Sequence, residues 1–264
     1  MQWFFALAEG CPGFDYYADL ARVAVHTAMR HTSLQPHFLY DGDENHFTRW
    51  LRDRQVPIIR CRTFLDTELA TFKGGPDEAN TRSTGRGILL RIELPQLQVQ
   101  LGLDDRVLYT DCDVFFRRDI AEDLRGLAPH YFAVGPEFSR DDYRHMNTGV
   151  MWMNLPQLRT VDAPFRAFVR QNLPRLPQIA WDQGAYREFF AGDENTFQWD
   201  RLPPELNWKP YWGDDPQAKV IHFHGPKPFQ RPYLDSHFPE LKTLTGGSYD
   251  DLCEEWAELL AEAK

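Results

Sequence analysis

The chain has 264 residues, of which 42% are hydrophobic and 26% are charged, so it can bury a full core and is not a disordered chain. Its 29 Lys and Arg against 39 Asp and Glu give a net charge of −10, which argues against nucleic acid or an anionic membrane surface as the main partner. No apolar run approaches the ~18 residues that a membrane-spanning helix needs. The opening MQWFFALAEG has no basic region before its apolar run, so we expect no integral membrane contact and no secretory signal.

The number and spacing of the cysteines indicate the redox environment of the protein. Cys11, Cys61, Cys112 and Cys253 lie far apart and form no CxxC pair, so the sequence offers no zinc motif. Scattered thiols in a chain that can build its own core are typical of reduced proteins inside the cell. We therefore expect four thiols with no disulfide between them and a cytoplasmic location.

The N-terminal part of the chain alternates predicted strands with predicted helices. The apolar run over 3–8 predicts a buried strand, and apolar residues at helical spacing predict a helix over 16–30. A strand over 37–40, a helix over 47–54 and a strand over 57–59 follow. This is the alternation of βαβ units, so we expect an α/β fold with a Rossmann-like, mostly parallel central sheet and helices on both faces.

Residues 73–87, KGGPDEANTRSTGRG, interrupt this alternation with four glycines, one proline and no large apolar side chain. Loops of this length inside a compact domain are usually functional or mobile. We expect a loop here that becomes ordered over a neighbouring site when a ligand binds.

The rest of the chain shows no clear domain boundary, so we expect a single domain over 1–264. The expected elements are helices over 88–101, 164–171 and 182–190 and strands over 106–109, 131–134, 150–154 and 219–223. Ser248 and Asp251 have the spacing of a capping box and precede an acidic helix over 252–263. We expect that helix to form an appendage of about 248–264.

Two Asp-x-Asp triplets occur, and their surroundings differ. Asp41-Gly42-Asp43 leads into polar residues, which favours a turn. Asp111 and Asp113 instead stand between the apolar runs VLY and VFF, at the carboxyl end of a predicted central strand. Carboxylates are costly to desolvate there unless a cation or hydrogen bonds compensate their charge, and α/β sheets bind ligands at this edge. The pair therefore predicts a metal site.

A second chemical signal lies near the end of the chain, in VIHFHGPKP at 220–228. His222 and His224 would point to the same side of a strand, and Lys227 follows just beyond the strand end. Lysine is scarce in this chain. Carboxylates and an imidazole that hold a divalent cation, with a lysine beside them, are suited to neutralising a diphosphate.

Several segments occur in a recognisable order along the chain. They are RIELPQL at 91–97, VLYTDCDV at 107–114, NTGV at 147–150 with Asn154 and Leu155, Asp182 with Gln183, LP at 202–203 with Asn207 and Trp208, and HFHG at 222–225 with Lys227 and Pro228. Together they resemble the retaining nucleotide-sugar transferases of glycosyltransferase family 8, which includes glycogenin and bacterial lipopolysaccharide galactosyl- and glucosyltransferases. The resemblance covers roughly residues 2–230.

The resemblance implies a GT-A type fold and an enzyme that transfers a hexose, glucose or galactose, from a nucleotide-diphosphate sugar of the UDP type. The acceptor would be a hydroxyl group, as on a glycan. Asp111, Asp113 and His222 would hold Mn²⁺, with Mg²⁺ as the alternative. The resemblance also implies retention of the donor's anomeric configuration, with Gln183 steadying a cationic sugar or Asp182 attacking it.

The resemblance also implies a set of donor-binding residues spread over the whole chain. These are Ala6, Ala8, Tyr17, Arg91, Asn147, Asp182, Gln183, Gly225 and Lys227. Two segments depart from the family pattern. Only Pro226 separates Gly225 from Lys227, where glycogenin-like members have two residues, and extra residues at 10–13 follow the first strand.

Two other functions stay open. A sugar nucleotidyltransferase would be expected to carry a glycine-rich, basic loop directly after the first strand. Gly10 and Gly13 occur there, but the first basic residue is Arg22. A non-catalytic protein that binds sugar nucleotides would be expected to have lost part of the site, whereas Asp113 and Lys227 are both present.

Overall fold

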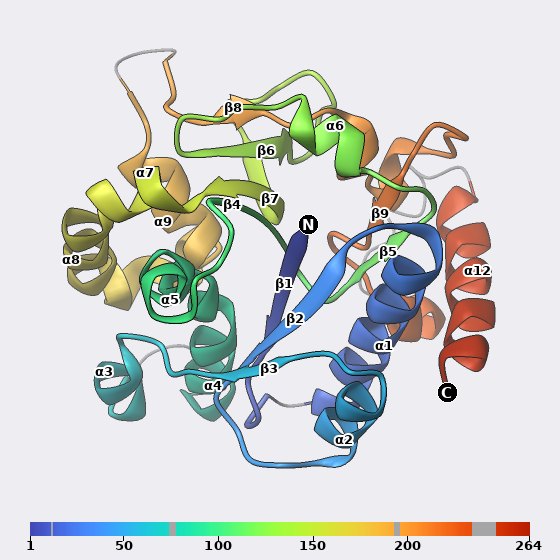
Figure 1. The fold of residues 1–264 in the computed structure, drawn as a ribbon, viewed down its shortest axis with the longest axis horizontal. Coiled ribbons are helices and arrows are strands. Elements are labelled where there is room, and N and C mark those ends of the chain that lie inside the picture. The colour runs from blue at the N-terminus through green and yellow to red at the C-terminus, as the bar shows by residue number, and fades with distance from the viewer. Residues whose placement is uncertain (12, 74–77, 193–195, 234–246) are drawn as a thin grey trace.

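The computed structural model describes residues 1–11, 13–73, 78–192, 196–233 and 247–264 (Figure 1). In this part of the chain a seven-stranded sheet runs through the centre, in the order β3-β2-β1-β4-β7-β6-β8. Its strands are β1 (Gln2–Leu7), β2 (Gln35–Tyr40), β3 (Ile58–Arg60), β4 (Arg106–Thr110), β6 (Phe132–Pro136), β7 (Met146–Asn154) and β8 (Asp200–Arg201).

The directions of these strands confirm the expected fold class. β1 pairs in parallel with β2 and with β4, and β2 pairs in parallel with β3. β7 runs antiparallel to β4 and to β6, while β6 and β8 are parallel. Four of the six pairings are therefore parallel, and the fold is α/β with a mostly parallel sheet. β1 is buried along its length because helices cover both faces of the sheet.

Helices lie on both sides of the strands (Figure 1). One face packs against α1 (Phe14–His31), α2 (His46–Asp53) and α6 (Ala121–Arg125). The other face packs against α3 (Asp66–Ala70), α4 (Glu78–Ile88), α5 (Leu94–Leu101), α7 (Leu155–Thr160), α8 (Asp162–Asn172) and α9 (Asp182–Phe189). Short 3-10 segments complete the described chain: η1 (Leu89–Glu93), η2 (Leu173–Ile179), η3 (Pro204–Leu206), η4 (Pro210–Trp212) and η5 (Pro228–Tyr233).

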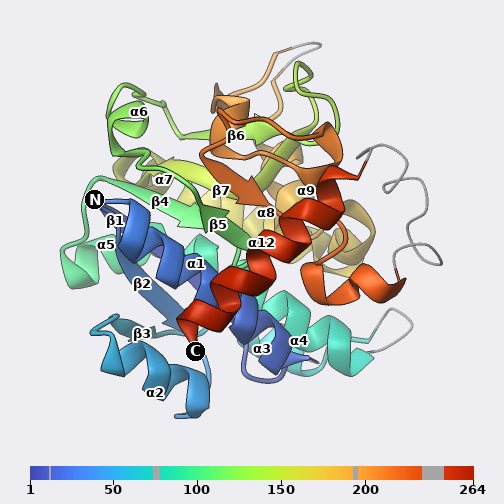
Figure 2. The same cartoon turned by 90° about the vertical axis from the view of Figure 1, so that its right-hand side faces the viewer.

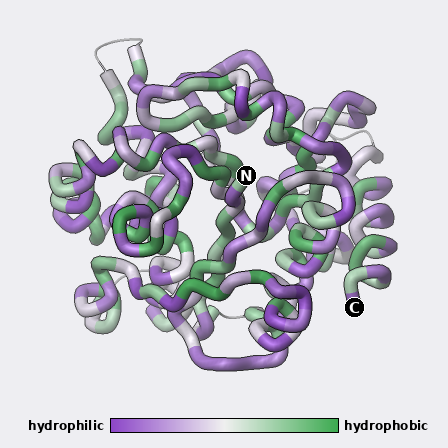
Figure 3. The backbone as a smooth tube through the Cα atoms, viewed as in Figure 1, coloured by the Kyte–Doolittle hydropathy of each residue, from purple (hydrophilic) through white to green (hydrophobic). Residues whose placement is uncertain are grey.

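A two-stranded sheet lies beside the central one. β5 (Val114–Phe116) pairs antiparallel with β9 (Val220–His222), so that Val114 lies opposite His222. The helix α12 (Ser248–Ala263) packs along α1 and against this small sheet through a shared apolar cluster (Figure 2). Its turns alternate between hydrophobic and hydrophilic residues, as Figure 3 shows, because one side of the helix is buried and the other faces water.

Every strand and helix expected from the sequence corresponds to an observed element, but the loop expected over 73–87 is wrong for most of its length. Residues 78–88 form α4, and residues 74–77 lie outside the described residues. The glycines of α4 allow close packing: a Cβ at Gly85 would stand 2.8 Å from the ring of Trp181, and one at Gly87 would stand 3.1 Å from the Ala8 nitrogen. The expected ordering of this segment over a bound ligand stays a prediction.

The capping box expected at Ser248 is also wrong. α12 already begins at Ser248, after Gly247 at φ 101°, and no described side chain caps its first turn. The Ser248 hydroxyl instead donates to the Pro210 carbonyl at 3.2 Å. Among the helices that the structure describes, none is both long and apolar enough to cross a membrane.

Candidate metal centre and its cavity

The site begins where β4 ends. Trp3 of β1 donates its indole N–H to the Thr110 hydroxyl at 2.9 Å, which fixes the last residue of β4. The next residue, Asp111, donates its backbone N–H to the carbonyl of Gly149 in β7 at 2.8 Å. Two residues later, Asp113 precedes β5 and is 6% exposed. The end of one central strand therefore places two carboxylates within three consecutive residues.

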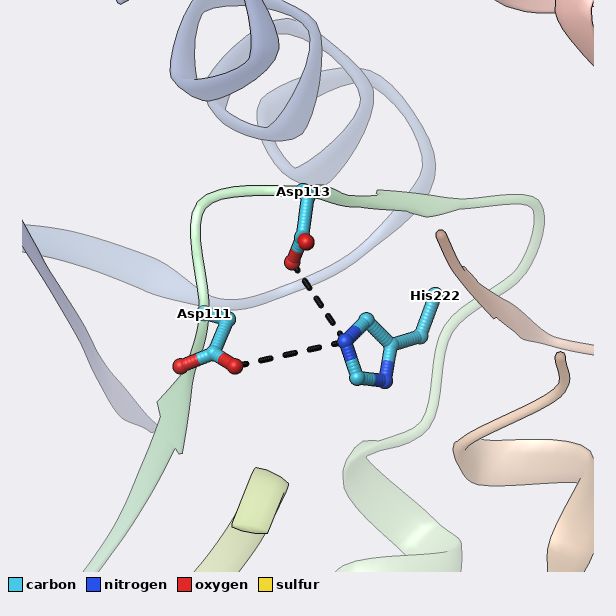
Figure 4. Close-up of side chains that lie close together, drawn as sticks. All are labelled: Asp111, Asp113 and His222. Atoms are coloured by element: carbon cyan, nitrogen blue, oxygen red, sulfur yellow. Dashed lines mark ion pairs between the residues drawn. The ribbon is translucent and has the colours of Figure 1, made fainter. Parts of the chain in front are cut away.

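His222 completes this cluster from the last position of β9. Its Nε2 lies 3.4 Å from Asp113 Oδ1 and 4.0 Å from Asp111 Oδ2. One ligand atom from each of Asp111, Asp113 and His222 can be chosen so that all three lie within 4.8 Å of one another. In Figure 4 the side chains of Asp111 and Asp113, from one stretch of chain, and that of His222, from another, point toward a common space.

The donor set fits a divalent cation. Asp113 Oδ1 is buried and accepts no hydrogen bond from the described residues, with only His222 Nε2 near it at 3.4 Å. On the far side of its ring, His222 bonds through Nδ1 to Asn207 Oδ1 at 2.9 Å, which leaves Nε2 to face the carboxylates. Two carboxylate oxygens and one imidazole nitrogen suit Mn²⁺ and, less well, Mg²⁺.

Lys227 supplies a positive charge beside the cluster. Its ammonium group pairs with Asp113 Oδ2 and donates to the Phe223 carbonyl at 2.7 Å. Burial raises the pKa of Asp113, but the ammonium group of Lys227, together with the neighbouring His222, outweighs it and holds that pKa well below its usual range. Burial likewise opposes the charge on Lys227, yet Asp113 raises the pKa of Lys227 above its ordinary value. The pair is therefore ionised at neutral pH.

The segment that carries Lys227 is anchored from outside the cavity. The Tyr249 hydroxyl in α12 donates to the Lys227 carbonyl at 2.8 Å. Gly225, two residues before Lys227, adopts φ 91°, a left-handed conformation that favours glycine at this turn. The chain turns sharply here and returns Lys227 to the strand end.

Arg91, in η1, connects the metal cluster to the start of α9. It is 2% exposed, and its guanidinium pairs with Asp111 and, at 3.1 Å, with Asp182. It also donates to the Thr148 carbonyl at 2.6 Å and stacks over Tyr109 at 4.2 Å. One buried arginine thus fixes two carboxylates that the sequence places far apart.

Asp182 lies at the first position of α9. Burial raises the pKa of Asp182 to about 6, although the charge on Arg91 lowers it. The Thr148 hydroxyl donates to the Asp182 carboxylate at 3.1 Å. The two residues before it, Ala180 and Trp181, both adopt positive φ, 62° and 55°. Consecutive non-glycine residues in this conformation are strained, and such strain is concentrated at functional sites.

Gln183 is held at both ends of its amide. Its Nε2 donates to Glu137 Oε1 at 2.7 Å, and its Oε1 accepts from Asn147 Nδ2 at 2.9 Å. Glu137 lies directly after β6, beside His224, whose Nε2 is 3.5 Å from the Glu137 carboxylate. Asn147 lies near the start of β7, three residues before Val150, where the strand expected over 150–154 begins and pairs with β4. Gln183 is therefore rigidly placed.

These side chains surround a cavity of about 360 Å³. Of the residues expected to bind a donor or a metal, ten line it: Ala6, Ala8, Tyr17, Arg91, Asp111, Asp113, Asn147, Asp182, Gln183 and Lys227. Gly225 and His222 do not belong to the lining; Gly225 shapes the turn before Lys227, and His222 reaches the site by facing the two aspartates.

Sequence reasoning gave no role at the site to several lining residues, although His224 and Thr148 lie in segments that it singled out. Glu137, Thr148 and His224 line the cavity, as do Ser83 and Thr84 of α4. Glu137 comes three residues after the strand predicted over 131–134 and directly after the observed β6, so its place beyond a strand end is the signal that would have found it. The two α4 residues carried no such signal, because their segment was expected to be a loop.

Comparisons with known proteins show which solved structures share this fold. Neither a protein-family model nor a curated protein sequence matches the chain. Among solved structures, the galactosyltransferase LgtC, in complex with donor and acceptor sugar analogues, superimposes with a TM-score of 0.64. The match has 17% sequence identity and covers 93% of this chain and 95% of that of LgtC.

The fold is of the GT-A type. Two further solved structures share it. Mouse xyloside xylosyltransferase 1 matches with a TM-score of 0.57 and 16% identity over 85% of this chain and 97% of its own. The glycosyltransferase GlyE of Streptococcus pneumoniae TIGR4 matches with a TM-score of 0.59 and 15% identity over 99% of this chain but only 63% of its own.

Proposed function

We propose that this protein is a metal-dependent, retaining glycosyltransferase that moves glucose or galactose from a UDP-sugar to a hydroxyl group on a glycan. The observation that carries the proposal is the convergence of Asp111, Asp113 and His222 at the end of β4, directly beside the cavity and Lys227. The unpartnered oxygen of Asp113 supports a cation there. The GT-A fold and the resemblance to family 8 support the choice of reaction.

The cavity offers a place for each part of the donor. Ala6 and Ala8, at the carboxyl end of β1, and the ring of Tyr17 form one wall and would bind the base. Lys227 would bind the diphosphate, with the Gly225 turn holding it in position. The sugar would then lie against Arg91, Asn147, Asp182 and Gln183.

The chemistry follows from where charge develops. A bound Mn²⁺ or Mg²⁺ would act as a Lewis acid on the leaving diphosphate. Lys227 adds a second positive charge at the same point, in a largely buried setting where electrostatic stabilisation is strong. We propose that Gln183, fixed by Glu137 and Asn147, steadies the cationic sugar. The acceptor hydroxyl would pass its proton to the departing phosphate on the same face.

A reducing compartment, the cytoplasm, belongs to the same proposal. It is supported by the cysteines, because none of the four forms a disulfide in the described part of the chain. Cys112 stands between the two metal-binding aspartates, and burial raises the pKa of its thiol well above the ordinary value. A thiol in that state is a poor nucleophile and metal ligand, which leaves coordination to the carboxylates and His222.

The test is a donor assay in which purified protein is incubated with UDP-glucose or UDP-galactose. Mn²⁺ is added or left out, and each reaction is run with and without members of a panel of oligosaccharides. We expect UDP release that requires Mn²⁺ and rises with one of the oligosaccharides. Release of pyrophosphate from UTP and a sugar phosphate would instead identify a nucleotidyltransferase. Tight binding of UDP-sugar without any turnover across the panel would identify a non-catalytic binding protein.

A further inference from the structure

A line of three buried amides joins Glu137 to His222. Gln183 Nε2 donates to Glu137 Oε1 at 2.7 Å, and Asn147 Nδ2 donates to Gln183 Oε1 at 2.9 Å. Asn207 Nδ2 donates to Asn147 Oδ1 at 3.1 Å, and Asn207 Oδ1 lies 2.9 Å from His222 Nδ1. All five side chains are at most 8% exposed, so water does not substitute for these bonds. We call this line the amide relay.

The orientation of each amide in the amide relay is fixed by neighbouring groups that can only accept or only donate a hydrogen bond. The carboxylate of Glu137 only accepts hydrogen bonds, so Gln183 must turn its NH₂ group toward Glu137 and its oxygen toward Asn147. The backbone N–H of Thr148 also donates to Gln183 Oε1, and that of Gly149 donates to Asn147 Oδ1, both at 3.3 Å. Each amide in turn must present its oxygen to the next donor along the line.

The last oxygen of the amide relay faces the histidine. Asn207 Oδ1 accepts, so the hydrogen of a neutral His222 ring lies on Nδ1 and the lone pair lies on Nε2. Nε2 is the atom that faces Asp111 and Asp113. With the hydrogen on Nε2 instead, Nδ1 would carry the lone pair, and Asn207 would have to rotate its NH₂ group toward Nδ1. That rotation would set the Asn207 oxygen against Asn147 Oδ1 and leave both oxygens without a donor between them.

We propose that Glu137 is a positioning residue for His222, which acts through Gln183, Asn147 and Asn207 to hold the imidazole in the Nδ1–H tautomer that can bind a cation. The inference rests on the proposed metal role of His222. Partners behind a metal ligand fix its tautomer and orientation, and here that partner is several residues removed from the ring. Because Gln183 also lines the cavity, the same bonds fix the amide beside the sugar position.

The first test reads the tautomer in the metal-free protein. The protein is labelled with ¹⁵N-histidine, and the ring nitrogens are read at an alkaline pH at which their signals no longer change with pH. A His222→Asn variant identifies the His222 signals among those of the nine histidines. We expect a protonated Nδ1 and an unprotonated Nε2. A protonated Nε2 in the wild-type protein would overturn the proposal whatever the enzyme's activity.

The second test separates hydrogen bonding by Glu137 from its charge. Glu137→Met removes the acceptor, whereas Glu137→Gln removes the charge but keeps an oxygen that can accept from Gln183. We expect the Met variant to show both His222 tautomers and Mn²⁺ affinity reduced ~10–100-fold by calorimetry. The Gln variant should keep the Nδ1–H tautomer and most of the affinity. Equal losses in both variants, or no loss in either, would contradict the relay.

The design also keeps this inference separate from the proposed function. Should Glu137→Met not fold, Gln183→Met interrupts the line one residue nearer to His222, with the same expected loss. Should the wild-type protein bind no Mn²⁺ at all, the proposed function fails, and the ¹⁵N spectra still decide whether Glu137 controls the His222 tautomer.

Discussion

Gly149 lies directly against the imidazole ring of His222. A Cβ at position 149 would stand 2.0 Å from His222 Cε1 and 2.6 Å from Nε2, far inside any contact that real atoms make. Because β7 has no side chain at this point, the ring can lie over the strand and turn Nε2 toward the two aspartates. The glycine is therefore required by the position of the metal ligand rather than by its own backbone conformation.

We expect Gly149→Ala to displace His222 and to weaken Mn²⁺ binding by about 10-fold or more. The overpacked core should also lose ~1–3 kcal/mol of stability. Gly126→Ala is the matched control, because a Cβ there would meet atoms no closer than 3.4 Å and φ is −67°. Calorimetry with Mn²⁺ and urea unfolding of both variants measure the two effects. Unchanged Mn²⁺ affinity in Gly149→Ala would show that His222 is not the ligand.

Metal-dependent turnover should require the Asp-x-Asp triplet at 111–113 and should not require the one at 41–43. EDTA should abolish transfer and added Mn²⁺ should restore it, because Asp111, Asp113 and His222 supply a cation site. We expect Asp113→Asn to reduce turnover about 100-fold or more, since each tenfold loss corresponds to ~1.4 kcal/mol in the barrier. Asp43→Asn, at the exposed end of the triplet over 41–43, should leave turnover unchanged. Full activity in excess EDTA would contradict the metal role.

Arg91→Lys should destabilise the folded protein. A lysine cannot reach Asp111, Asp182 and the Thr148 carbonyl together, so buried charges would lose their partner, at a cost on the order of 3 kcal/mol. Arg144→Lys is the control, because the Arg144–Asp142 pair is exposed and such pairs contribute little. Urea denaturation followed by tryptophan fluorescence measures both. Equal stability of Arg91→Lys and wild type would refute a structural role for the arginine.

Asp182 should make stability depend on pH. Its folded-state pKa of about 6 lies above the ordinary 3.8, so folding favours the protonated form. The stabilisation is fully present below about pH 4 and is lost as pH rises through about 6. Over that range wild type should lose on the order of 3 kcal/mol relative to Asp182→Asn, which cannot titrate. Parallel stability curves for the two proteins would show that Asp182 has no raised pKa.

The product should retain the anomeric configuration of the donor. An inverting enzyme needs a general base on the face opposite the leaving group. The amide of Gln183 cannot act as that base, and Asp182 is engaged by Arg91 and Thr148. Proton NMR of the first product from an α-linked donor decides the question. An α-glycoside agrees with the proposal, whereas a β-glycoside would exclude the family 8 mechanism.

The sequence could predict the strands and the ligands that follow strand ends. The apolar runs of β1 and β4 identify buried strands without any tertiary information, and Asp111 and Asp113 follow the second of them directly. The expected sheet and the place of the two aspartates at a strand end depend on such local patterns. No long-range packing has to be known to predict them.

What could not be predicted depends on packing between distant segments. β7 begins at Met146, four residues earlier than expected, because Asn147, Thr148 and Gly149 are polar or small and do not look like a strand. Its reversed direction sets these first residues beside the end of β4. α4 was missed because its glycines disfavour a helix locally, while their close contacts with Trp181 and Ala8 favour one in the folded protein.

The bond from Tyr249 to the Lys227 carbonyl connects the interface between α1 and α12 to the cavity. A change at that interface would therefore alter the position of Lys227. α12 is held there by Leu252 and Trp256 in an apolar cluster outside the cavity. A small molecule that bound within this cluster would separate α12 from α1. Through the Tyr249 bond it would also displace the Lys227 main chain. We expect such a molecule to raise the KM for the nucleotide sugar without entering the cavity, and to be selective for proteins that carry this helix.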